Sequence, residues 1–213
     1  MKYLAMVIIG MAFVVSAHAE GDGIAGRLQV GVSNSGSSPA EKNELNRGSG
    51  EAVAAIYGIS RNVGLDLTLG SVLYGTKDKF FRDGTVSVGT YMLGARYVWR
   101  TDKRFLPYIR AGVGLSTIHH KENDGARVWD IVYGRDYSYD FKNAWGMYEG
   151  GGFTWFLTSN RKWSLGMDIR FFSARAEAKQ TLAYSGGSAP TVTSKTFNFG
   201  GSVTGIDLSY SFF

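Results

Sequence analysis

Apolar and polar side chains alternate along most of the chain with a period of two residues, which indicates strands rather than helices. The clearest stretch runs from Trp163 to Phe171, where large apolar residues alternate with Ser, Gly, Asp and Arg. The same alternation predicts eight strands, at residues 24–34, 51–60, 63–73, 87–100, 105–116, 144–157, 163–171 and 197–213. Strands of globular proteins usually have about 5–6 residues, whereas a membrane-crossing strand needs about 9–11. The predicted lengths therefore favour strands that cross a membrane.

The connections between these strands alternate in length. Three are short, at residues 61–62, 101–104 and 158–162, and four are long, at residues 35–49, 75–85, 117–143 and 175–196. Short turns at one rim, long loops at the other and an even number of strands are typical of outer-membrane barrels. We therefore predict an all-β protein, an eight-stranded antiparallel transmembrane β-barrel with short periplasmic turns and long extracellular loops.

The third long loop contains further apolar residues. Residues 128–133 and 137–141 flank Gly134-Arg135-Asp136, which predicts a hairpin that extends the two neighbouring strands above the bilayer. A ten-stranded barrel is the alternative, although both arms are short for a membrane crossing.

Charged residues within the predicted strands fall on the face opposite the bulky apolar residues. A Lys or Arg that faces lipid at the bilayer centre costs about 2–4 kcal/mol, so this face is predicted to line the lumen. Glu149 shares its parity with Phe153 and Trp155, but a bulge at the glycines 150–152 would turn it inward. The predicted lumen charges are Arg27, Asp66, Arg96, Arg110, Glu149, Asp168, Arg170 and Asp207.

These lumen charges are nearly balanced in sign. Because buried charges must pair, and an eight-stranded barrel is just wide enough for side chains or one small ligand, we expect a paired network that plugs the barrel. A selective polar pore is the alternative. Four apolar or aromatic residues are also predicted to point inward and to offer a site to a small hydrophobic ligand: Ile56, Val88, Met92 and Tyr148.

Large aromatic residues gather where strands meet the short turns or the C-terminus. Aromatic girdles at the membrane interface are a feature of such barrels. The predicted girdle consists of Trp99, Phe105, Trp155, Trp163, Tyr210 and Phe212.

The first nineteen residues resemble a secretory signal peptide. Lys2 precedes an apolar run, and Ala17-His18-Ala19 forms an A-x-A cleavage pattern. We therefore expect a signal peptide at 1–19 and one barrel domain at 20–213. Removal of Lys2 would change the net charge from +5 to +4, with 22 basic and 18 acidic residues. This mild charge does not predict nucleic-acid binding.

The chemistry available to the chain is limited. Without cysteine, it has no disulfide, thiolate metal site or cysteine nucleophile. His119-His120, near Ser116 and Glu122, could serve a lipid-modifying enzyme or a metal, but adjacent residues of a strand point to opposite faces. We expect no catalytic residue, metal or cofactor. In the second long loop, Lys77, Lys79 and Arg82 could bind lipopolysaccharide phosphates.

Three stretches resemble small bacterial outer-membrane barrels, and most closely the OmpW-like family. They are residues 104–114, which resemble the family's PY-x-x-AG-x-G strand, residues 153–171, and the aromatic C-terminus. OmpX-like and OmpA-like barrels share the same succession of strands, short turns and long loops. The resemblance implies an outer-membrane location and passive binding or passage of small hydrophobic molecules. It also implies recognition of the C-terminal strand by the barrel-assembly machinery.

The expected surroundings are outer-membrane lipids and lipopolysaccharide, and a monomer is expected. The alternative function is a structural or adhesive barrel that acts through its extracellular loops, with the hairpin around Trp129 and Tyr133 as its contact edge. A lipid-modifying enzyme that uses His119 or His120 is a third alternative.

Overall fold

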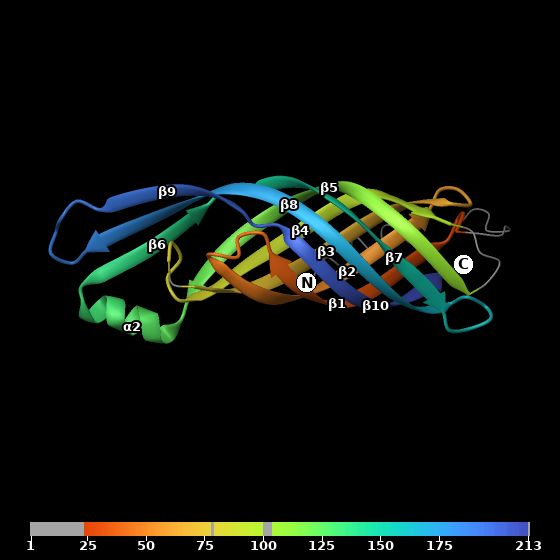
Figure 1. Ribbon diagram of the computed structural model, residues 1–213, viewed down its shortest axis with the longest axis horizontal. Helices are drawn as coiled ribbons and strands as arrows, with labels where there is room; N and C mark the ends of the chain where they lie inside the picture. The colour runs from red at the N-terminus through yellow and green to blue at the C-terminus, as the bar shows by residue number, and fades with distance from the viewer. Residues whose placement is uncertain (1–23, 78, 100–103, 213) are drawn as a thin grey trace.

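The computed structural model describes residues 24–77, 79–99 and 104–212 and forms a barrel with an extension at one end (Figure 1). The predicted signal peptide lies outside the described residues. The strands are β1 (Leu28–Pro39), β2 (Leu45–Gly58), β3 (Val63–Thr76), β4 (Gly84–Val98), β5 (Phe105–Glu122), β6 (Arg135–Phe141), β7 (Ala144–Phe156), β8 (Trp163–Tyr184), β9 (Thr191–Asn198) and β10 (Gly201–Phe212), and the helix is α2 (Asp124–Val132). Within these residues, no helix is long and apolar enough to span a membrane.

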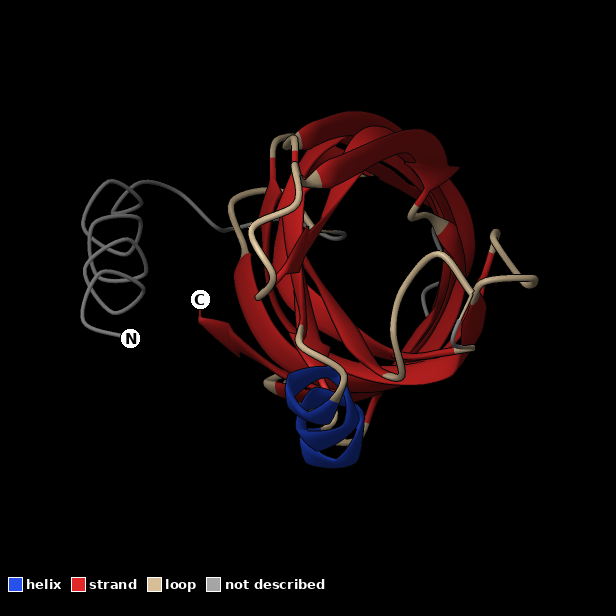
Figure 2. Ribbon diagram, turned by 90° about the vertical axis from the view of Figure 1, so that its left-hand side faces the viewer, coloured by secondary structure: helices blue, strands red, loops and turns tan. Residues whose placement is uncertain are grey.

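Eight of the strands close into an antiparallel ring, in the order β1, β2, β3, β4, β5, β7, β8 and β10. The view along the barrel axis shows this closed ring (Figure 2). If the paired residues are followed once around the ring from Leu28, the path returns to Ser38, ten residues further along β1 (38 minus 28). This stagger is the shear that tilts the strands of a closed barrel. The predicted eight-stranded barrel is confirmed.

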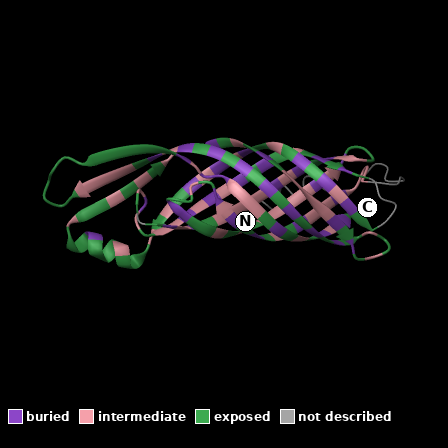
Figure 3. Ribbon diagram, viewed as in Figure 1, coloured by how far each residue is buried: buried purple, intermediate pink, exposed green. Residues whose placement is uncertain are grey.

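Exposed and buried residues alternate along the strands of the barrel wall (Figure 3). On β8, from Trp163 to Arg170, each exposed residue is followed by a buried one. The exposed set is apolar and the buried set is polar or small, the reverse of a soluble barrel. The outer wall is therefore a surface for lipid.

The remaining two strands extend one side of the wall beyond the ring. The upper part of β8 pairs with β6 on one side, from Ala178 to Tyr184, and with β9 on the other. Most of the loop predicted at residues 175–196 is therefore strand. The loop predicted at 35–49 is also shorter, because β1 continues to Pro39 and β2 begins at Leu45.

The hairpin predicted at residues 128–141 is wrong. Its first arm lies in helix α2, and its second arm is β6, which pairs with β8. The apolar residues of the first arm recur at the spacing of three to four residues that suits a helix. Gly134 follows the helix with a φ of 63°, and its N–H donates to the carbonyl of Ile131. Glycine in the left-handed region is a common helix terminator.

Candidate functional site: a two-layered lumen

Asp66 on β3 is the centre of an ion-pair layer across the lower lumen. Its Oδ2 atom lies 3.0 Å from Arg96 Nη2 and 3.0 Å from Arg110 Nη1, and the Thr68 hydroxyl donates to Oδ1 at 2.9 Å. The layer continues through Arg110 Nη2 to Asp168 Oδ2, at 3.1 Å. The strand register places these residues on β3, β4, β5 and β8, on the inner face of the wall. Four strands of the ring are therefore joined through the lumen.

Arg170 completes this layer on its upper side, with Nε 3.3 Å from Asp168 Oδ2. Asp207 lies beside the layer and lines the same small cavity as Arg96 and Arg110. This cavity has a volume of about 30 Å³, which leaves room for only a few water molecules. The structure therefore brings together six of the eight predicted lumen charges, and they nearly fill the barrel at this level.

The other two predicted lumen charges lie elsewhere. Arg27 precedes β1, at the periplasmic end of the barrel. Glu149 is exposed on the outer wall, which contradicts the prediction that it points inward.

The register of β7 explains the position of Glu149. Its pairing with β5 and β8 runs without interruption through the glycines 150–152, so no bulge inverts the strand. A Cβ atom on Gly152 would lie 2.8 Å from the Cα of Asp168, and one on Gly150 would lie 3.0 Å from the Cα of Arg170. These glycines allow close approach of β8, rather than a bulge.

The upper lumen is apolar. Val88, Met92 and Tyr148 are buried there in one cluster with Phe172 and Ile118. Ile56 is also buried, but it lies lower, where it lines the cavity of the ion-pair layer. Three of the four predicted ligand-site residues are thus brought together, and the fourth is not.

Tyr148 lies flat on the inner wall, over two glycines of neighbouring strands. A Cβ on Gly94 would come within 2.3 Å of its hydroxyl, and a Cβ on Gly112 within 2.7 Å of its ring. The two glycines therefore leave the space that the ring occupies, and the ring in turn covers their backbone.

The mouth of the barrel is filled by aromatic side chains that the sequence reasoning missed. Phe80 and Phe81, in the loop between β3 and β4, pack against Phe197 with ring centroids 4.9 and 5.0 Å away. Tyr139, Phe141 and Phe199 complete the cluster, in which Phe81 is fully buried. The only signal was the Phe80-Phe81 pair in an otherwise polar loop.

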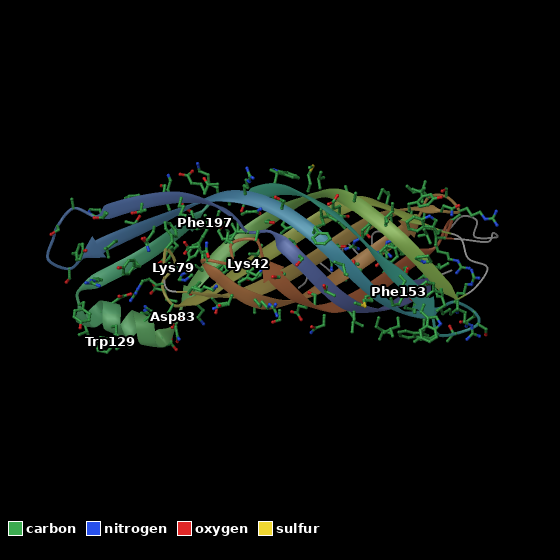
Figure 4. All side chains as sticks on the ribbon, viewed as in Figure 1. Lys42, Lys79, Asp83, Trp129, Phe153 and Phe197 are labelled. Atoms are coloured by element: carbon green, nitrogen blue, oxygen red, sulfur yellow. The ribbon has the colours of Figure 1, made fainter. Side chains whose placement is uncertain are left out.

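Several elements hold this loop, residues 79–83, in the mouth. The Arg82 guanidinium donates to both carboxylate oxygens of Asp130 on α2, at 3.0 and 3.2 Å. The Phe80 N–H donates to Glu44, and the Phe80 carbonyl accepts from Gln180 at 2.6 Å. The mouth is therefore closed by a tethered loop, whose first and last residues are Lys79 and Asp83 (Figure 4).

Two titratable groups lie beside this tether, outside the membrane-spanning part. His120 Nε2 lies 3.1 Å from the Arg82 carbonyl and stacks on Phe81. Burial lowers the pKa of His120, despite that hydrogen bond. Burial, and secondarily Asp130, raises the pKa of Glu122.

The remaining predicted sites are dispersed. His119 and His120 point to opposite faces of β5, and no cluster of three or more metal-ligating side chains occurs among the described residues. Arg82, one of three cations expected to meet lipopolysaccharide, is engaged with Asp130. The six girdle aromatics lie at the strand ends near the periplasmic turns, with Trp163 and Tyr210 in edge contact at 5.0 Å.

The closed ring, the apolar outer wall and the plugged polar lumen define a small transmembrane β-barrel. A model of the outer membrane protein beta-barrel domain matches residues 5–212. The chain therefore belongs to this family and is a protein of the bacterial outer membrane.

Solved structures agree with this fold. The chain is similar to the outer membrane protein OprG from Pseudomonas aeruginosa, at 14% identity and a TM-score of 0.72, over 90% of this chain and 98% of that one. It is similar to outer membrane protein AlkL, at 18% identity and 0.58, over 92% and 94%. It is also similar to Neisserial surface protein A, at 15% identity and 0.53, over 87% and 96%. No curated protein matches the chain.

Proposed function

We propose that the barrel takes up small hydrophobic molecules from the extracellular side and holds them in its upper lumen for passage across the outer membrane. The observation that carries this proposal is the layering of the lumen, in which an apolar chamber stands above a closed ion-pair layer. Apolar walls with a few polar groups are typical of small-molecule sites. The mechanism needs no catalytic step.

Entry from outside requires the loop of residues 79–83 to leave the mouth. The chamber lined by Val88, Met92, Phe172 and Phe199 has a volume of only about 30 Å³ in the closed state. Displacement of Phe80 and Phe81 would enlarge it. Passage of the molecule towards the periplasm would then require Arg96 and Arg110 to exchange partners, because the ion-pair layer around Asp66 blocks a straight path through the lumen.

Blocking the chamber tests this function. Met92→Trp fills the upper lumen, whereas Leu93→Trp places the same side chain on the outer wall, where Leu93 is 55% exposed. We expect Met92→Trp to lower the uptake of a hydrophobic dye into liposomes at least fivefold, and Leu93→Trp to leave it unchanged. Equal uptake by the two variants would contradict the proposal.

Helix α2 supports a second candidate, in which the extracellular extension contacts other surfaces. Val128, Trp129, Ile131, Val132 and Tyr133 are each 60–67% exposed, and Trp129 stacks on Tyr133 with centroids 5.9 Å apart. The polar Asp130 instead faces the protein. Large exposed apolar patches commonly mark interaction sites.

This second candidate has its own test. Trp129→Ser with Ile131→Ser removes exposed apolar surface but leaves the contact between Asp130 and Arg82. We expect loss of bacterial attachment to surfaces with unchanged uptake of the dye. Attachment at the level of the unsubstituted protein would exclude α2 as the contact surface.

The partners of the barrel in the membrane are also proposals. The aromatic girdle would meet phospholipid headgroups, and Lys79 would meet lipopolysaccharide phosphates. The alternating apolar residues Ile206, Leu208, Tyr210 and Phe212 of β10 would be read by the assembly machinery. Phe213 lies outside the described residues.

A further inference from the structure

Where the apolar upper lumen meets the ion-pair layer, several buried donors have no hydrogen-bond acceptor in the described chain. They are Arg170 Nε, the Tyr148 hydroxyl and Arg110 Nε, and Arg110 Nη2 is paired in charge with Asp168 at 3.1 Å but is not aligned for a hydrogen bond. Arg170 is 6% exposed and Tyr148 is 3% exposed. Arg170 Nε lies near Asp168 but is not aligned for a hydrogen bond. Native proteins pair most buried polar groups, so this grouping of unpaired donors requires an explanation.

Arg170 separates the two layers of the lumen. It lines the lower cavity together with Arg96 and Arg110, and it also lines the upper chamber together with Met92 and Phe172. Tyr148 is the direct register partner of Phe172, and its ring lies 5.6 Å from the guanidinium carbon of Arg110. Arg170 thus meets the apolar walls of the chamber, and Tyr148 belongs to the apolar cluster that includes Met92 and Phe172.

The ion pairs at this level are also shared unevenly. Within the ion-paired set, Arg96, Arg110 and Arg170 face two aspartates, Asp66 and Asp168. The third carboxylate, Asp207, lines the lower cavity but not the upper chamber. An anionic acceptor that reaches Arg170 from above would therefore supply a hydrogen-bond acceptor on the side of the layer that none of the three aspartates lines.

We propose that the chamber selects small carboxylates with an apolar body. The carboxylate would accept hydrogen bonds from Arg170 and the Tyr148 hydroxyl, and the apolar body would lie between Val88, Met92 and Phe172. Charge-assisted hydrogen bonds are about twice as strong as neutral ones, which sets the preference for an anion. This inference rests on the proposed uptake function and names its substrate class.

The test compares phenylacetate with phenylacetamide, which has the same shape without the charge. Binding to the refolded full-length barrel in lipid nanodiscs is measured by calorimetry, with empty nanodiscs as the reference. We expect phenylacetate to bind at least tenfold more tightly at pH 7. Tyr148→Phe should weaken phenylacetate binding about three- to tenfold, and the matched control Tyr108→Phe, which lies below the ion-pair layer, should not.

Arg170→Gln gives a second test in case Tyr148→Phe disturbs folding, and heat-modifiable gel migration checks both variants. This substitution should reduce the preference for the acid over the amide to less than threefold. If both probes bind equally, or if neither variant alters phenylacetate binding, the carboxylate site is wrong while the uptake function stands. If neither probe binds and Met92→Trp leaves dye uptake unchanged, both proposals are wrong.

Discussion

At the scale of single residues, position in the wall decides the effect of a charge. Asp66 is fully buried and meets two arginines and a threonine, whereas Glu149 is exposed on the outer wall among apolar neighbours. In a buried ion pair, the cost of removing both charges from water offsets much of the attraction between them. Removal of one partner, however, leaves the other charge buried and uncompensated. Carboxylates at these two positions should therefore have opposite effects on stability.

Asp66→Asn should lower the free energy of unfolding by about 3–5 kcal/mol, because Arg96 and Arg110 both lose the negative charge that they share. Urea unfolding in lipid vesicles, followed by tryptophan fluorescence, measures this change. Adding Arg96→Met should restore part of the loss. If the single variant is as stable as the unsubstituted protein, the ion-pair layer does not stabilise the barrel.

Glu149→Leu should leave the stability unchanged or raise it by up to about 1–2 kcal/mol, since a charged residue on the lipid face is unfavourable. The same unfolding experiment applies, with Asp136→Leu at an exposed position of β6, outside the ring, as a control. A large loss of stability in Glu149→Leu would mean that this carboxylate has a partner.

His120 should make the mouth sensitive to acid. Burial lowers the pKa of His120 in the folded protein below the ordinary value of about 6.5. The unfolded chain therefore binds more protons at this residue than the folded protein does. The contribution of neutral His120 to stability is complete above pH 6.5 and is lost as the pH falls. Hydrogen-exchange protection of residues 79–83 should therefore decrease from pH 7.5 to pH 5.5. In His120→Gln this decrease should be smaller than in the unsubstituted protein. If the two proteins lose the same protection, titration of other groups causes the loss.

At the scale of elements, the loop of residues 79–83 and helix α2 are coupled. The Arg82–Asp130 pair connects an aromatic lid in the mouth to a helix on the outer side of the extension. The Arg82 side chain is 24% exposed, so the pair is only partly shielded from solvent. It fixes the loop position more than it adds to overall stability.

Asp130→Asn should loosen the lid, because the bidentate charge-assisted contact is lost. We expect faster hydrogen exchange in residues 79–83 and faster dye uptake, with unchanged urea unfolding of the barrel. Asp124→Asn, in the exposed first turn of α2, is the matched control. Identical exchange in both variants would show that the pair does not hold the lid.

At the scale of the whole molecule, two barriers lie in series along the axis, an aromatic lid above and an ion-pair layer below. Both are built on a wall that one strand, β8, extends beyond the ring. The lid therefore rests on strands continuous with the membrane-spanning wall. Both barriers must change before water can pass.

Planar-bilayer recordings should consequently find the unsubstituted barrel without stable open channels. Combining Asp130→Asn with Asp66→Asn should produce small discrete openings, because it weakens the lid and the ion-pair layer together. Each single variant should remain closed. Frequent openings in the unsubstituted protein would contradict the plugged lumen.

The sequence by itself determined the barrel, its strand number, its outward apolar face and most of its lumen charges. These follow from a period of two, because parity alone assigns a strand residue to lipid or lumen. The aromatic girdle follows for the same reason, since Trp155 and Trp163 combine outward parity with a position beside a short turn.

Only the tertiary structure decided what parity does not encode. Glu149 was misplaced because glycines 150–152 fit both a bulge and a close approach of strands, and only the register with β8 distinguishes the two. Helix α2 is held against the mouth by the contact of Asp130 with Arg82, almost fifty positions away in the chain, which parity does not reveal. The lid of Phe80 and Phe81 likewise depends on contacts with Phe197 and Gln180, which closure of the barrel brings to the same rim.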